Sequence, residues 1–89
     1  MTEYECSTGH WQEITEENYN YALEVLPPEK WLVIQGVNIF RMCEYLYFDV
    51  TAHYASAAGR FFVAYRPINY SYERMAREIT ELVERRTTQ

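Results

Sequence analysis

The chain has 89 residues and a formal net charge of −5, which allows one domain with a single hydrophobic core. Its 48% hydrophobic residues, with only three Gly and three Pro, exclude an intrinsically disordered chain. The sequence lacks an apolar run of the length that spans a membrane, and its acidic excess disfavours free nucleic acid as a partner.

Residues 1–13 show little periodicity and are predicted to form an N-terminal arm or a short irregular strand. The opening "MTEYECSTGHWQE" has neither the basic start nor the apolar core of a signal peptide. The two cysteines, Cys6 and Cys43, lie far apart in the sequence and form no disulfide framework. We therefore expect a cytoplasmic protein of a bacterial host cell, with reduced thiols.

The first helix is predicted over residues 15–26. Thr15 is a good N-cap, and Glu16 and Glu17 stand in the first turn, where the helix dipole favours negative charge. Apolar residues follow with helical spacing until Pro27 and Pro28, which end the helix because proline cannot continue the hydrogen-bond ladder.

Residues 37–66 predict a three-stranded antiparallel meander. The run from Trp31 to Tyr47 is apolar, β-branched and aromatic, with Gly36 as a bend, and a first strand is placed at 37–45. The segment "YFDVTAHYAS" alternates as a second strand, a turn follows at 56–59, and Arg60–Arg66 forms the third strand. Such short spacings favour an antiparallel meander over parallel crossovers, which need a dozen or more linking residues.

A second helix is predicted over residues 72–86, with Ser71 as its N-cap and one unbroken apolar stripe. Its opposite face mixes Glu and Arg and is expected to face solvent. The element order α-β-β-β-α predicts an α+β fold, in which a three-stranded antiparallel sheet carries both helices on one face. Residues 1–89 are expected to form a single domain.

Charge is distributed unevenly along the chain. The first 29 residues carry seven Glu and no Lys or Arg, whereas the remaining sixty residues carry a net charge of +2. This asymmetry favours a basic protein surface as the partner, although the excess Glu also serves solubility. The candidate partner-binding carboxylates are Glu13, Glu16, Glu17 and Glu24.

The strand "GRFFVAYRP" is apolar on both of its faces. Phe61, Val63 and Tyr65 alternate on one side, and Phe62 and Ala64 fill the other. If both helices cover one face, the other set faces outward, and the pattern leaves open which set that is. The outward face is then closed by the arm or by a second subunit, or else it is a docking surface, and a homodimer is the favoured expectation because a two-fold dimer is the commonest closed assembly. Phe61, Phe62 and Tyr65 are therefore further candidate partner-binding residues.

No catalytic constellation stands out in the sequence. His53 would share a strand face with Asp49 and Thr51, but a nucleophile, a base and an oxyanion site would all have to converge there. Cys6 and His10 make one pair, which is too few ligands for zinc. Cys43 beside Glu44 is more often a small buried hydrophobe than a reactive thiol. We expect no enzymatic activity, no metal and no cofactor, and the roles of Cys6, Cys43 and His53 stay open.

One alternative is a small nucleic-acid-binding sheet. Arg41, Arg60 and Arg66 lie among aromatic residues on predicted strands, and such a sheet can stack single-stranded bases. The acidic first third of the chain opposes this alternative, so no direct binding of nucleic acid or membrane is expected.

The sequence resembles a family of small uncharacterised proteins of proteobacterial plasmids and mobile elements. The resemblance covers about residues 19–75 and rests on Leu26-Pro27-Pro28 followed by Trp31, on Phe40 with Glu44, and on Gly59-Arg60-Phe61-Phe62 leading to Ala64, Arg66 and Pro67. It implies a phage or mobile-element setting, in which small acidic proteins often block host defence, as anti-CRISPR proteins do. The expected function is a non-enzymatic acidic protein-binding module that inhibits a host defence nuclease complex by covering its basic nucleic-acid-binding surface. The alternative is a self-associating structural domain.

Overall fold

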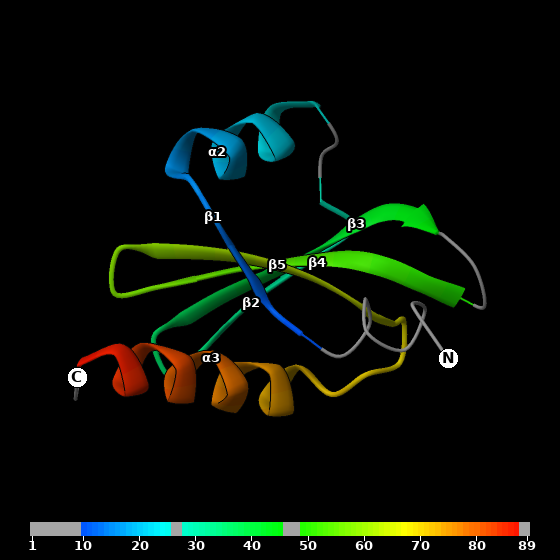
Figure 1. Cartoon of the computed structure of the whole chain (residues 1–89). Helices are drawn as coiled ribbons and strands as arrows, with labels where there is room; N and C mark the ends of the chain where they lie inside the picture. Colours follow the sequence, from blue (N-terminus) through cyan, green and yellow to red (C-terminus); the bar gives the residue numbers. More distant parts are fainter. Residues whose placement is uncertain (1–9, 26–27, 46–48, 88–89) are drawn as a thin grey trace.

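The computed structural model describes residues 10–25, 28–45 and 49–87, with the side chains of 43–45 and 86–87 excepted. In this part of the chain, a five-stranded antiparallel sheet lies between two helices (Figure 1). The elements are β1 (Gln12–Ile14), α2 (Glu16–Val25), β2 (Lys30–Ile34), β3 (Val37–Tyr45), β4 (Val50–Ala57), β5 (Arg60–Pro67) and α3 (Tyr72–Thr87). Neither helix combines the length and the apolarity needed to cross a membrane.

The sheet has the strand order β1-β5-β4-β3-β2, so β2 to β5 form a meander and β1 is added beside β5. Two-residue turns join β2 to β3 and β4 to β5. Gln35 and Gly36 have φ of 51° and 81°, and Ala58 and Gly59 have φ of 53° and 75°. Two successive positive φ values match the right-handed twist of the flanking strands, and glycine reaches them without a Cβ penalty.

The larger core lies between α3 and one face of the sheet. Ser71 caps α3 as the sequence predicts, because its Oγ accepts a hydrogen bond from the Arg74 backbone N–H at 3.2 Å. The apolar stripe of α3 then packs on alternate strand residues. The buried side chains of this core are Val37, Ile39, Ala55, Phe62, Tyr72, Met75, Ala76 and Ile79.

A smaller core lies on the opposite face, beneath α2. Thr15 caps this helix, its Oγ1 accepting a hydrogen bond from the Asn18 N–H at 3.1 Å. The buried side chains of the smaller core are Tyr19, Phe40 and Met42. Since α2 has only ten residues, it shields a smaller part of its sheet face than α3 does.

The predicted fold is correct in its α+β class and antiparallel pairing, and wrong in two respects. The sheet has five strands instead of three, and the helices lie on opposite faces instead of one. The helix placement follows from β5, whose Phe61 and Phe62 point to opposite sides and must each be covered. One helix cannot bury both sets, so α3 packs over Phe62 and α2 over Phe61.

The two strands missing from the predicted sheet are the edge strands β1 and β2, although a short irregular strand was one alternative for residues 1–13. β1 has only three residues, and its pairing of Ile14 with Phe61 joins segments far apart in the sequence. β2 lies within an unbroken apolar run, where only the Gln35-Gly36 turn separates it from β3. Lys30–Ile34 pairs with β3 along its whole length.

Candidate functional site

Tyr19 anchors α2 to the sheet. Its ring centroid lies 5.4 Å from that of Phe40, 4.8 Å from that of Phe61 and 6.4 Å from that of Tyr54. Edge-on aromatic contacts of this kind stabilise a pair beyond its buried area alone. Tyr19 is therefore the buried anchor of α2, with Leu23 packed against the same core.

Three aromatic rings form a ladder across the sheet below Tyr19. Trp31, Phe40 and Tyr54 lie opposite one another on β2, β3 and β4. The Trp31 and Phe40 rings are stacked with centroids 5.2 Å apart, and those of Phe40 and Tyr54 are stacked at 5.1 Å. This ladder stabilises the α2 side of the sheet, because each ring packs on its neighbour across the strands.

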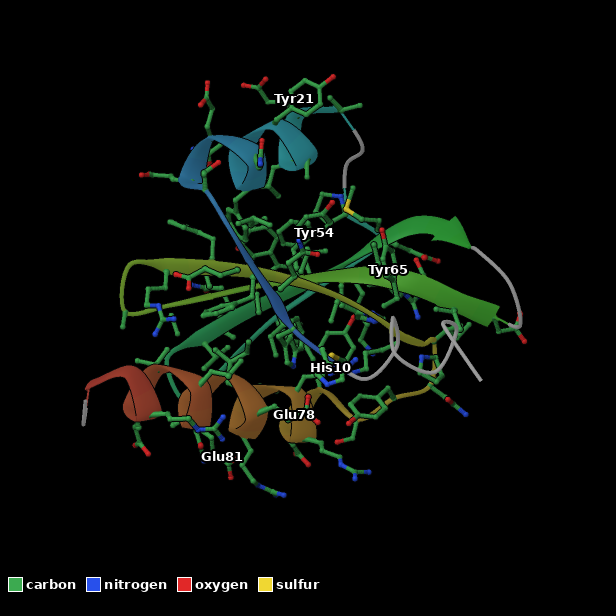
Figure 2. The ribbon with its side chains drawn as sticks, viewed as in Figure 1. His10, Tyr21, Tyr54, Tyr65, Glu78 and Glu81 are labelled. Carbon is green, nitrogen blue, oxygen red and sulfur yellow. The ribbon has the colours of Figure 1, made fainter. Side chains whose placement is uncertain are left out.

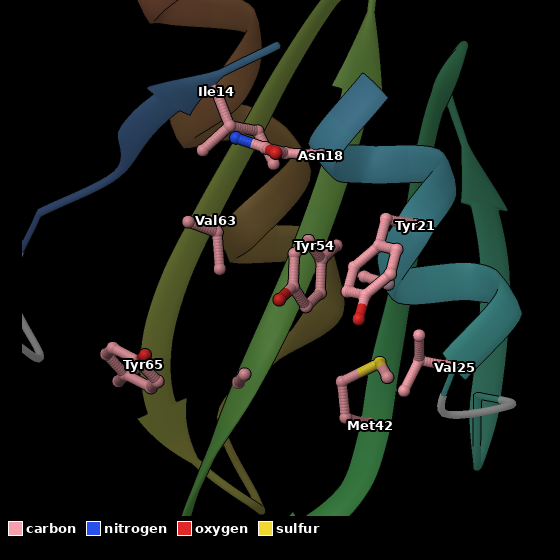
Figure 3. A pocket seen from close by; sticks show the side chains of 10 residues that line it. Ile14, Asn18, Tyr21, Val25, Met42, Tyr54, Val63 and Tyr65 are labelled. Atoms are coloured by element: carbon pink, nitrogen blue, oxygen red, sulfur yellow. The ribbon is translucent and has the colours of Figure 1, made fainter. Parts of the chain in front are cut away.

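Beside the ladder, α2 and the sheet enclose a groove of about 490 Å³, which we call the α2 groove (Figure 3). The helix wall comes from Asn18, Tyr21, Ala22 and Val25, and the sheet wall from Ile14, Met42, Ala52, Tyr54, Val63 and Tyr65. Its volume lies within the range of about 300–1,000 Å³ that is typical of ligand sites.

The α2 groove is apolar, with tyrosine hydroxyls as its main polar groups. Its described lining contains no Asp, Glu, His, Lys or Arg. Burial first, and the electrostatic influence of neighbouring Tyr65 second, raise the pKa of Tyr54, so that its hydroxyl stays protonated at neutral pH. The groove thus offers hydrogen-bonding hydroxyls on an apolar wall, and its lining supplies no group suited to general acid–base work near pH 7.

The exposed residues of α2 include apolar ones at the groove and glutamates outside its lining. Of the large hydrophobic side chains exposed in the described part of the chain, Tyr21 is 66% exposed and Val25 is 50% exposed, and both line the groove from α2. All three charged residues of α2 are exposed glutamates, Glu16, Glu17 and Glu24. Figure 2 shows Tyr21 at the outer side of α2, with Tyr54 and Tyr65 on the sheet side.

The structure brings some of the sequence-predicted partner residues together on this side. Glu16, Glu17 and Glu24 are exposed on α2, and Tyr65 lies in the groove wall. Phe61 shares this face but is half-buried, with its ring against Tyr19.

Two predicted partner residues lie elsewhere. Phe62 is a core residue beneath α3, with 2% of its surface exposed, so it is not available to a partner of the folded monomer. Glu13 forms a two-pronged hydrogen-bonded ion pair with Arg60, at 2.8 and 2.9 Å, at the β1–β5 edge. Its charge is therefore matched within the chain.

On the opposite face, a polar cluster ties the N-terminal segment to α3. Glu78 accepts hydrogen bonds from Trp11 Nε1 at 2.8 Å, from the Tyr70 hydroxyl at 2.6 Å and from the Arg66 guanidinium at 3.2 Å. Burial alone would raise the pKa of Glu78, but these donors outweigh it and hold the pKa below its usual value. Arg66 also lies against the Trp11 and Tyr70 rings. These contacts hold the fold together.

His53 does not form the catalytic arrangement considered from the sequence. It is fully buried, and its Nδ1 lies 3.1 Å from the Thr51 carbonyl, which makes Nδ1 the donor. Burial is the main cause that lowers the pKa of His53 to about 4. The Thr51 hydroxyl donates to the Met42 carbonyl, and Asp49 is exposed before β4. The ring packs edge-on against Tyr72 and is inaccessible to substrate.

The metal pair considered from the sequence lies partly outside the described residues, since Cys6 is not among them. The side chains of Cys43 and Glu44 are likewise not described. Within 10–25, 28–45 and 49–87, no three His, Cys, Asp or Glu side chains gather as a metal ion would require.

Sequence reasoning missed Tyr21, Val25 and Tyr54 as site residues. Tyr21 and Val25 lie four residues apart on α2, next to the stripe that packs on the sheet. The sequence did carry a signal for these two residues. The helix has more apolar residues than one core-facing stripe needs, so the additional ones must line a second surface.

The comparisons with known proteins give a family and no activity. A family model described as "Protein of unknown function (DUF1419)" matches residues 2–75. No curated protein and no solved structure matches the chain. The expected resemblance to an uncharacterised small family is thereby confirmed at the level of the family.

Proposed function

The chain belongs to the DUF1419 family, whose description assigns no activity, and we propose from the geometry that it is a non-enzymatic protein-binding module. In this proposal, the α2 groove holds an apolar segment of a partner protein, and the glutamates of α2 contact basic residues beside that segment. The groove lining supports a binding role over a catalytic one, because its described residues offer tyrosine hydroxyls and one amide but no ionised group.

The observation that carries the proposal is the coincidence of an exposed apolar groove with a helix of a single charge sign. α2 has three glutamates and no basic residue, whereas α3 mixes Glu with Arg along its exposed face. Exposed aromatic side chains such as Tyr21 and Tyr65 are typical anchors of protein interfaces. The exposed glutamates of α2 then select partners by charge and speed their association.

The charge pattern also defines the partner class. A segment that fits has one or two apolar or aromatic side chains for the groove and Lys or Arg on either side for Glu16, Glu17 and Glu24. Basic nucleic-acid-binding grooves of nuclease complexes present such segments, and covering one would inhibit the complex. The more specific form of the proposal is therefore an inhibitor of a host defence complex.

A peptide selection tests whether the α2 groove binds a protein segment of this class. A library of random peptides displayed on phage is selected on the immobilised protein, and the enriched peptides are then measured with purified variants. We expect enrichment of peptides that combine Arg or Lys with Leu, Phe or Trp. The double substitution Glu16→Lys/Glu17→Lys and the single substitution Val25→Lys should each weaken their binding at least tenfold.

The matched control reverses the same charge on the other helix. Glu73 and Glu84 are exposed on α3, so Glu73→Lys/Glu84→Lys makes an equal change in net charge away from the groove. Binding should persist in this variant. Enrichment of acidic peptides, or equal losses in both double variants, would reject the α2 groove as the binding site.

A further inference from the structure

Among the described residues, β2 is an edge strand with no strand on its outer side, and its side chains are unusual for such a position. Trp31, Leu32 and Val33 are consecutive, and they are 45%, 37% and 61% exposed. Edge strands are normally protected by charges, proline, a bulge or short length, since their unpaired backbone groups invite another strand. The other edge strand, β1, is protected in this way, having three residues with Glu13 at its centre. β2 has five residues, and its one charge is Lys30 at the start.

The exposed side chains of β2 point to both faces of the sheet. Trp31 stacks on Phe40 on the α2 side, and alternation places Val33 on that side and Leu32 on the α3 side. A partner that packs on one face would bury only one of these sets. A strand added in the plane of the sheet contacts both sets and pairs with the backbone as well.

The turn between β2 and β3 sets which backbone groups are free. In a two-residue hairpin, the residues that flank the turn form a hydrogen-bonded pair, here Ile34 and Val37. Hydrogen-bonded and non-hydrogen-bonded pairs then alternate along the strands. The N–H and C=O groups of Trp31 and Val33 are thereby directed away from β3, toward the open edge.

We propose that β2 pairs antiparallel with β2 of a second copy of this chain, about a two-fold axis at Leu32, so that two sheets become one. This register places Trp31 opposite the partner's Val33 and Val33 opposite the partner's Trp31. An aromatic residue then faces a β-branched one, which is a favourable cross-strand pair. The outward backbone groups of both strands meet in the same register, because Trp31 and Val33 carry them in each copy.

The charge distribution of β2 fits its own copy. Lys30 is the only charged residue of the strand, and its ammonium lies over the Tyr72 ring at 5.1 Å, on the α3 side. In the two-fold register, Lys30 faces the partner's Ile34, so the two lysines are not opposed. A strand of KWLVI therefore accepts a second KWLVI with no like charges in contact.

This dimer surface is separate from the α2 groove. The two-fold axis is perpendicular to the sheet, so both grooves open on the same side of the dimer and neither is covered by the pairing. Val33 on β2 and Val25 on α2 are both valines that are at least half exposed, which allows the same substitution to test each surface.

Sedimentation equilibrium of the full chain tests the proposal between about 1 µM and about 300 µM, the range expected for an interface of small area. We expect a shift from monomer to dimer over this range, with an isologous dimer as the end point. Val33→Lys should raise the dissociation constant at least tenfold, whereas Val25→Lys should leave it within twofold. Far-UV circular dichroism checks that both variants are folded.

A second variant tests the backbone pairing itself. Val33→Pro removes an N–H that does not serve the β2–β3 ladder, and proline is tolerated on an edge strand at such a position. This variant should stay folded and also lose the dimer, and the amides of Trp31 and Val33 in the unmodified chain should exchange hydrogen more slowly as concentration rises. A monomer at all concentrations, or a dimer that Val25→Lys disrupts and Val33→Lys does not, overturns the proposal. Either result leaves the peptide-binding test of the α2 groove intact.

Discussion

Trp11 and Glu78 are joined by a hydrogen bond of 2.8 Å, although 67 positions separate them in the sequence. The Glu78 carboxylate also accepts from Tyr70 and from Arg66, whose side chain is 3% exposed. One carboxylate therefore connects the segment before β1, the strand β5 and the helix α3.

Replacing Glu78 with Ala is expected to destabilise the protein by roughly 2–4 kcal/mol, because it leaves a buried guanidinium without this acceptor. Urea unfolding followed by circular dichroism measures the change. Glu84→Ala on the exposed face of the same helix is the control and should cost less than about 0.5 kcal/mol. Equal effects of the two substitutions would contradict this role for Glu78.

The low pKa of Glu78 adds an acid-dependent effect. Its carboxylate is favoured more in the folded than in the unfolded chain, so its contribution is present above the usual pKa of 4.5 and is lost as pH falls through the lowered value. In Glu78→Gln, the loss of stability below about pH 4.5 should be smaller than in the unmodified chain.

The buried His53 should give the stability of the protein a second pH dependence, at higher pH than that of Glu78. Its pKa is about 4 in the folded chain, against 6.5 when unfolded, because burial opposes the charged ring. Between these values the unfolded state binds more protons, so stability is full above about pH 6.5 and falls by roughly 3 kcal/mol as the pH drops toward 4. His53→Leu should flatten the stability curve between pH 6.5 and 4.5, as measured by urea unfolding at each pH. An unchanged curve for His53→Leu would show that the loss has another source.

The turn at Ala58-Gly59 offers a stabilising substitution. Ala58 has a φ of 53°, in the left-handed region where asparagine is better tolerated than alanine, and Asn-Gly is a preferred pair for this turn. Ala58→Asn is expected to raise stability by about 0.5–1 kcal/mol. The thermal midpoint should rise by a few degrees, while Ala57→Asn, at the end of β4, should not give this gain. A fall in the midpoint of Ala58→Asn would argue against this turn conformation.

Salt should affect partner binding through α2. Because the glutamates of α2 are exposed, they act mainly on the association rate. For a peptide selected on the protein, raising the salt concentration should slow association and change dissociation little. In Glu16→Lys/Glu17→Lys, the association rate should be low and nearly independent of salt. A salt response equal to that of the unmodified protein would place the electrostatic contact elsewhere.

The sequence was sufficient for the elements whose signals are local. The caps at Thr15 and Ser71, the long apolar stripe of α3 and the strand over 37–45 depend on neighbouring residues, and the structure has them as predicted. The antiparallel meander follows from the short spacings between strands.

The sequence was insufficient where long-range pairing decides. β1 pairs with β5, where Ile14 lies opposite Phe61, and a three-residue segment is too short for its sequence to indicate that pairing. The alternation in β5 shows that both of its faces need to be covered, but it does not determine that α2, instead of the N-terminal arm or a second chain, covers the face of Phe61. The α2 groove was missed for the same reason, since it exists only because α2 crosses the face that carries Tyr54 and Tyr65.

The most direct test of the binding proposal is a map of amide chemical-shift changes when a selected basic, apolar peptide is added to the isotope-labelled protein. If the peptide binds in the α2 groove, the changes concentrate on α2 and on the groove positions of β4 and β5, including Tyr21, Val25, Tyr54 and Tyr65. Tyr21→Ser should remove them, because it takes away the most exposed aromatic wall of the groove. Changes concentrated on α3 or along the edge of β2, with α2 unaffected, would contradict the proposal that the α2 groove is the partner-binding site.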